Sequence, residues 1–351
     1  MMKNIVLVIG NGFDLNLGFK TSYKDFYESK FCPKDYPAPL IKYLNSRWGN
    51  NLDGVKWYDF ENELLNYYKK YERDGNVDDC VTDRERECLK VIEPYKIQFG
   101  VHYGYPKEIE SLIKKGIIIE PTLKLPQHMI PFQSDLCETA CWRDKEALNR
   151  IKDSLNKYIK QVSETQVNDD SVALKVLFKI ARLPKDENNV NIYTFNYTSL
   201  PAPCNTMLDG CVHHVHGSVE SGNIIIGTQD YAGMDSNYDF LQKSFDPQYA
   251  PPALVYDLQT ADEVIIFGHS LGVNDRQYFN SFFRQQSSPG NTVRKKITIF
   301  TRDESSKVEI KRSLQQISDN NLAMLYGMND LKIYQTKDVS ELAHETDILS
   351  V

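Results

Sequence analysis

The stretch Ile5–Asp14, IVLVIGNGFD, decides the fold. Five branched or long apolar residues follow one another without polar alternation, and the chain then reaches Gly10-Asn11-Gly12. An unbroken apolar run of this kind is typical of a strand buried on both faces of a parallel sheet. Glycines after such a strand let the backbone pass close to a bulky anion, and bare amide N–H groups at the start of the next helix attract it. We therefore expect a ligand at this turn.

The turn differs from the G-x-G-x-x-G fingerprint of dinucleotide-binding proteins. Leu15 occupies the position of the third glycine, and Gly18 comes later. A strand followed by a glycine turn that binds nothing explains this stretch equally well when it is taken alone. The rest of the chain has to decide between the two interpretations.

Composition describes a globular protein. The chain has 351 residues, of which 41% are hydrophobic, and this is enough for one large domain or two ordinary ones. Its formal net charge of −7 provides no field that would gather nucleic acid non-specifically, although a local basic groove is compatible with this balance.

The sequence also bears on the cellular compartment. No apolar run approaches the roughly 20 residues of a membrane span, and the N-terminus enters the first strand without a signal peptide, so we expect a cytoplasmic protein. The seven cysteines are odd in number, scattered and without a C-x-x-C pair. They indicate free thiols and argue against a structural zinc site.

The first half of the chain is predominantly helical in pattern. From about Pro33 to Tyr105 it is rich in Tyr, Lys, Glu, Asp and Asn and contains no apolar run of strand length. The segment from Ser134 to Val162 predicts one long helix or a broken pair, and Val172 to Leu183 predicts a further helix. We assign 31–170 to a helical insertion between 1–30 and 171–351.

Short strands alternate with helices in the second half, which is the pattern of a parallel sheet covered on both faces. The sequence therefore predicts an α/β protein with a Rossmann-like, mostly parallel sheet and a helical insertion. The predicted strands after the first are Val190–Phe195, Val212–Val219, Asn223–Gly227, Glu263–Phe267, Lys296–Phe300 and Leu331–Gln335.

Polar clusters follow three of these strands, at the sheet edge where such folds bind ligands. Asn196 follows the first, where it could orient a water or a ribose hydroxyl or simply tie down its own turn. His213, His214 and His216 occupy the second. A zinc site there lacks a partner with familiar spacing, so His216 is the better candidate for a general acid or base, and His214 better fits a core histidine.

The third cluster, Gly268-His269-Ser270-Leu271-Gly272, matches the G-x-S-x-G elbow of acyl hydrolases. In that elbow the serine stands at the start of a helix. Here Asn274-Asp275 predicts a helix cap several residues later, which makes a serine hydrolase the minor interpretation.

Taken together, these motifs resemble the AbiH-type phage abortive-infection proteins. The resemblance spans nearly the whole chain in motif order: Ile-Gly-Asn-Gly-Phe-Asp-Leu, Thr-Ser-Tyr-Lys-Asp-Phe, Trp57 with Asp59-Phe60-Glu61, Phe-Asn-Tyr-Thr, Val-His-Gly and Gly-His-Ser-Leu-Gly-x-x-Asp. More distantly, the motifs are similar to the sirtuin-like NAD-binding fold.

This resemblance implies NAD as the substrate and places residues around it. Asn196 and His216 would be catalytic and flank the nicotinamide ribose. The residues that would contact the rest of the dinucleotide are Gly10, Asn11, Gly12, Phe13, Asp14, Gly268, His269 and Ser270.

The chain departs from the sirtuin-like pattern in two ways. Thr198 stands where the acid after the loop asparagine is usual, and the paired C-x-x-C zinc module is missing, so protein deacetylation is not expected. The activity that remains is cleavage of the N-glycosidic bond of NAD through an oxocarbenium-like ribose. Asn196 would hold the water or a ribose hydroxyl, and His216 would accept a proton. Asp14 would offset the positive charge, or serve only as an early-helix acid.

Two other functions compete with this one. A catalytically silent nucleotide sensor would use the helical insertion to engage a partner or a phage-derived trigger. A nuclease is disfavoured by the acidic balance and by the lack of clustered carboxylates for divalent metals. The expected partners are thus a nucleotide ligand, with a phage trigger and a homo-oligomer left open, and no membrane.

Overall fold

The computed structural model describes residues 2–49, 59–74 and 133–337. Its centre is a six-stranded sheet with the order β3-β2-β1-β4-β5-β6, in which every pairing is parallel. This is the strand order of the doubly wound Rossmann fold. The strands are β1 (Lys3–Ile9), β2 (Asn188–Thr194), β3 (Val212–His214), β4 (Glu263–Phe267), β5 (Lys296–Thr301) and β6 (Asp330–Gln335).

The central position of β1 explains its apolar sequence. Ile5, Leu7 and Ile9 pack into the core on one face of the sheet, whereas Val6 and Val8 pack into the core on the other. All five are at most 3% exposed. A strand with two neighbours and two covered faces has no solvent-facing side, so polar alternation would bury unpaired polar groups.

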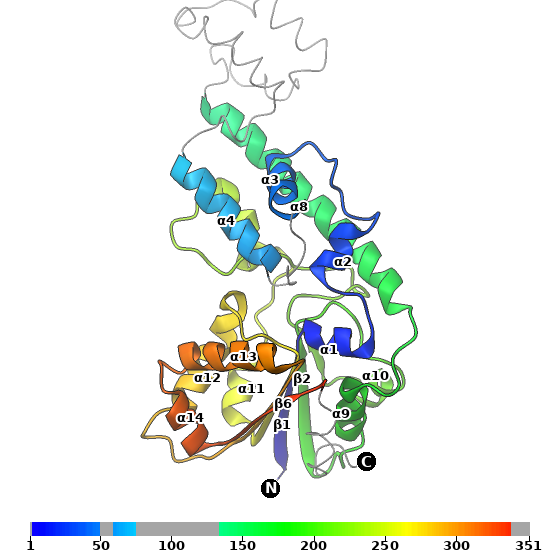
Figure 1. Cartoon of the computed structure of the whole chain (residues 1–351), viewed down its shortest axis with the longest axis vertical. Coiled ribbons are helices and arrows are strands. Elements are labelled where there is room, and N and C mark those ends of the chain that lie inside the picture. The colour runs from blue at the N-terminus through cyan, green and yellow to red at the C-terminus, as the bar shows by residue number, and fades with distance from the viewer. Residues whose placement is uncertain (1, 50–58, 75–132, 338–351) are drawn as a thin grey trace, which may run out of the picture.

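Helices cover both faces of the sheet (Figure 1). One layer contains α1 (Asn11–Leu17), α9 (Val172–Ala181) and α10 (Cys204–Met207), which share a core with the odd-numbered residues of β1. The opposite layer contains α11 (Leu254–Thr260), α12 (Arg276–Gln286), α13 (Glu304–Ile317) and α14 (Leu322–Met328).

A third group of helices lies beyond the carboxyl ends of the strands (Figure 1). It consists of α2 (Tyr23–Glu28), α3 (Pro39–Trp48), α4 (Asp59–Asp74) and α8 (Gln133–Ser163), and we call it the helical layer. Its core also includes Ile224, Ile226, Tyr238 and Leu241 from the second half of the chain. The helical layer therefore contains α2 and residues that follow β3, which lie outside the predicted insertion, in addition to helices within it.

Most predicted elements are present at nearly the predicted bounds. The strand at Glu263–Phe267 is confirmed, and Ser134 to Val162 lies within the single helix α8. The prediction of a strand at Asn223–Gly227 was wrong, and the strand from Val212 ends at His214. Gly217 turns the chain there with a φ of 77°, and the apolar residues that follow enter the core of the helical layer instead of the sheet. Predictions that fall within 75–132 lie outside the described residues.

Candidate functional site

The sheet changes winding direction at β1. The chain proceeds from β1 to β2 and β3 on one side and then to β4, β5 and β6 on the other. In doubly wound sheets, ligands bind outside the carboxyl ends of the strands at such a switch point. The loops after β1, β2 and β4 meet here, beneath the helical layer.

The glycine turn after β1 packs directly against the turn after β4. The Gly10 amide donates to Phe267 O and the Gly12 amide to Gly268 O, both at 2.9 Å. A Cβ built on Gly12 would lie 2.7 Å from Gly268 Cα. The expectation of bare amides at this turn was wrong for these two groups, because the second loop already occupies the space that a phosphate would need.

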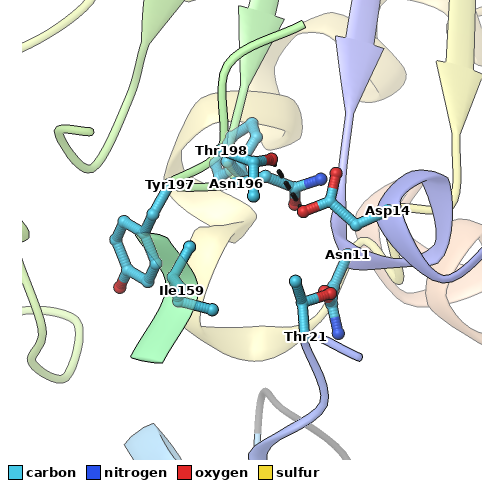
Figure 2. Close-up of a pocket in the computed structure, with 8 residues that line it drawn as sticks. Asn11, Asp14, Thr21, Ile159, Asn196, Tyr197 and Thr198 are labelled. Atoms are coloured by element: carbon cyan, nitrogen blue, oxygen red, sulfur yellow. Dashed lines mark hydrogen bonds between the residues drawn. The ribbon is translucent and has the colours of Figure 1, made fainter. Parts of the chain in front are cut away.

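A pocket opens beside the glycine turn. It has an empty volume of about 230 Å³ and is lined by Asn11, Asp14, Thr21, Ile159, Phe195, Asn196, Tyr197 and Thr198. That volume includes space open to solvent. The space available to the centre of a water-sized sphere is about 10 Å³, which is enough for about one ordered water and far below the about 300–1,000 Å³ of a typical ligand site. Figure 2 shows the carboxylate of Asp14 turned toward Thr198 and Asn196, with Ile159 of α8 across the pocket.

Asp14 is the charged residue of this pocket. It is only 3% exposed, and the Thr198 hydroxyl donates to its Oδ2 at 2.7 Å. Burial raises the pKa of Asp14 to about 7, while hydrogen bonds from Thr198 and Asn196 oppose the shift. In the part of the chain that the structure describes, no basic side chain contributes to this pKa. Thr198 thus stands where an acid was expected from the resemblance and instead contacts an acid from α1.

Asn196 joins the β2 loop to the glycine turn. Its Nδ2 donates to Gly10 O at 3.1 Å, and its own carbonyl lies 3.2 Å from His214 Nδ1. The sequence left open whether the Asn196 side chain ties down its own turn; in the structure its amide contacts a neighbouring loop. Asn196 also lines the pocket, so the same amide stands beside the space that a ligand would enter.

His216 lies in a second polar group, which we call the buried ionic cluster. Its members are Glu61 of α4, His216, Lys243 of the short 3₁₀ helix η4 (Lys243–Phe245), His269 and Asp275. Lys243 Nζ lies 2.9 Å from Glu61 Oε2 and 3.1 Å from Asp275 Oδ1. The Phe195 ring packs against both histidines and also lines the pocket, so it links the two groups.

The charge states in the cluster follow from these contacts. Burial alone would lower the pKa of Lys243, but the carboxylates of Asp275 and Glu61 outweigh it and the pKa is raised. Burial, reinforced by the Lys243 charge, lowers the pKa of His216 to about 3. Lys243 Nζ lies 3.3 Å from His216 Nε2, and because an ammonium can only donate, this contact places the ring proton on Nδ1.

The remaining predicted dinucleotide contacts lie outside the pocket lining. His269 Nε2 lies 3.4 Å from Asp275 Oδ2, and the Phe13 ring packs edge-on against Phe267. Ser270 is not among the residues that line the pocket, and α12 begins only at Arg276, so the hydrolase elbow does not form. The sequence interpretation missed Lys243, which lies in an irregular segment where no local pattern distinguishes a buried lysine from a solvated one.

Neither a metal centre nor a membrane-spanning helix is present within 2–49, 59–74 and 133–337. No group of three or more His, Cys, Asp or Glu side chains there is arranged to hold a metal ion. None of the described helices combines the length and the apolar character that crossing a membrane requires.

Comparison with protein families matches residues 6–295 to the family described as bacteriophage abortive infection AbiH. The chain belongs to the AbiH family. The match covers most of this AbiH protein, from the first strand to the residues just before β5. No curated protein and no solved structure matches the chain.

Proposed function

We propose that this AbiH protein hydrolyses the N-glycosidic bond of NAD or a related nucleotide as its part in abortive infection. The observation that carries the proposal is the pocket at the sheet's switch point, where Asp14 of α1 meets Asn196 and Thr198 of the loop after β2. Family membership supports the role in phage defence.

The pocket offers what the hydrolysis requires. It has room for about one water, which is the nucleophile of the reaction. Hydroxyl, amide and carboxyl groups line it, while Ile159 and Tyr197 provide an apolar wall. A positively charged ribosyl group forms as the glycosidic bond breaks, and a buried carboxylate stabilises such a charge more strongly than one in water does. The nucleotide itself would lie at the open side of the pocket, with its ribose facing the water.

Nicotinamide release from NAD by the purified full chain tests this proposal. We expect turnover in the wild type and a loss of at least about 100-fold in Asn196→Ala, because this variant removes a polar group that lines the pocket. Asn189→Ala is the control, since Asn189 is an exposed residue near the start of β2, the strand that Asn196 follows. Absence of turnover with NAD, NADP and ADP-ribose, with or without phage lysate, would contradict the proposal.

A catalytically silent nucleotide sensor is the second candidate. Two features favour it: the pocket is small, and the Lys243 ammonium occupies the His216 nitrogen that would accept a proton. A sensor would gain thermal stability on binding ADP-ribose or NAD, because a ligand that binds only the folded state raises stability by mass action, yet it would release no nicotinamide. Thermal shift and product assays on the same sample separate the two functions.

A further inference from the structure

We propose that Asp14 is the catalytic base of the pocket, which takes a proton from the water that attacks the ribosyl carbon. This inference rests on the hydrolase function proposed above and goes beyond it by assigning the proton transfer. It also moves that role from His216, where the motif pattern placed it, to a residue of the helix that follows the glycine turn.

The position of Asp14 is the first argument. Its carboxyl group lines the pocket, between two neutral side chains that donate to it, Thr198 and Asn196 (Figure 2). These contacts fix the direction of the carboxyl group without neutralising it. A base must lie within hydrogen-bond reach of the proton it removes, and a water in this pocket would meet that requirement.

The surroundings of His216 are the second argument. His216 is not among the residues that line the pocket, and the Phe195 ring packs against it edge-on. Its Nε2 faces the Lys243 ammonium at 3.3 Å, and burial lowers its pKa to about 3. A ring in this arrangement is a poor proton acceptor, whereas burial raises the pKa of Asp14 to about 7, within the range that suits a base near neutral pH.

Among the described residues, the partners of the buried Asp14 carboxyl are the neutral side chains of Thr198 and Asn196, and none of them is basic. Its contacts in the structure are hydrogen bonds with neutral groups, whereas the other acids of comparable burial either pair with a basic side chain, as Glu61 does with Lys243, or accept a backbone amide, as Asp144 does from Leu40. Burying an acid in this way costs stability, which makes it a candidate for function.

The chemical step is balanced. Water forms a bond from its oxygen to C1′ of the ribose, while the C1′–N bond breaks and its electron pair leaves with the neutral nicotinamide. The proton of the water passes to the Asp14 carboxylate and is later released to solvent. The products are ADP-ribose, nicotinamide and one proton, so no oxidant or metal is required.

The test compares Asp14→Asn with Asp25→Asn. Asp25 is also an acid in the first turn of a helix, but it lies in α2 and accepts from Ser22 instead of lining the pocket. We expect Asp14→Asn to lower kcat for NAD by about 10²–10⁴-fold while ADP-ribose binding is retained, and Asp25→Asn to keep kcat within about twofold.

The pH profile provides a readout that a merely structural role would not move. Thr198→Val removes a hydrogen bond that favours the charged form of Asp14, so the acid limb of the kcat profile should shift to higher pH. An unchanged limb, or wild-type kcat in Asp14→Asn, would overturn the assignment while leaving the hydrolase function intact. A wild type without NAD turnover would overturn the function and this inference together.

Discussion

Gly268 shows how closely two loops of the site approach each other. Its φ of 65° lies in the left-handed region, and a Cβ there would meet Gly12 C and Phe13 N at 2.4 Å. The glycines of the first turn were recognised from the sequence as sites of close backbone approach. The approaching group is another loop of the same chain, which a linear pattern could not reveal.

We predict that Gly268→Ala destabilises the fold by about 2–5 kcal/mol. An alanine would be strained at this φ, and its Cβ would also overlap the backbone of Gly12 and Phe13. Gly210→Ala is the matched control, since Gly210 has a φ of 78° but nothing within 4 Å of its built Cβ. Its expected cost is about 1 kcal/mol. Urea unfolding of both variants measures the difference, and equal losses would contradict the close-packing argument.

A second prediction concerns Asp14 and stability. The pKa of Asp14 rises from 3.8 to about 7 on folding, chiefly because burial disfavours the charge. The unfolded chain therefore gives up this proton first, so the free energy of unfolding falls as pH rises between about 4 and 7. Asp14→Asn removes that cost. At pH 8 it should raise the free energy of unfolding by on the order of 2–4 kcal/mol, and the melting temperature should rise with it.

The gain should disappear near pH 4, where the carboxyl is protonated in both states. Melting curves of wild type and variant across this range provide the measurement. A gain that stays constant with pH would show that the charge of Asp14 is not the cause. Because activity is not needed, this result is independent of any substrate.

At the scale of elements, the buried ionic cluster connects α4 of the helical layer to the residues that follow β3 and β4. Lys243 is 2% exposed and pairs with Glu61 from one side and Asp275 from the other. Burial raises the pKa of Glu61 to about 7, with the Asp275 charge adding to the shift and Lys243 opposing it. The lysine therefore holds two carboxyl groups together that would otherwise repel each other.

We predict that Lys243→Met destabilises the protein by about 3–5 kcal/mol at neutral pH, because it leaves buried carboxylates without their cation. The loss should shrink toward pH 5 as Glu61 becomes protonated. Arg47→Met is the control. Arg47 of α3 pairs with Glu63 of α4, the helix that also carries Glu61, but Arg47 is exposed, and exposed pairs contribute about 0–1 kcal/mol. Similar losses in the two variants would contradict a structural role for the cluster.

Regular elements were predictable because their patterns are local. The apolar runs of β1 and β4 and the spacing of α9 agree with the structure to within about two residues. The segment from Val215 to Gln242 was not predictable. Its apolar residues Ile224, Ile226, Tyr238 and Leu241 belong to the core of the helical layer, and its backbone is largely irregular. A run such as Ile224–Ile226 has the same composition whether a sheet or a helical core receives it.

At the scale of the whole molecule, the sequence predicted which loops form the candidate site, but it did not predict which of their side chains line the pocket. Asn196, His216 and Gly268 follow separate strands, and the structure brings them to one edge of the sheet. The alignment of parallel strands made that convergence predictable. Which side chain lines the pocket depends on packing by Phe195, Ile159 and Lys243, which come from three distant segments.

The central place of β1 has a consequence for biosynthesis. Its neighbours begin at Asn188 and Glu263, so β1 is made well before either strand that flanks it in the sheet. At about 5–20 residues per second, β2 leaves the ribosome roughly 10–40 s after β1, and β4 later still. Throughout that interval the apolar segment IVLVI has no partner strand on the growing chain and is prone to aggregate. Production of this protein therefore depends on how well the cell shields nascent chains, and a burst of synthesis would be its most aggregation-prone moment.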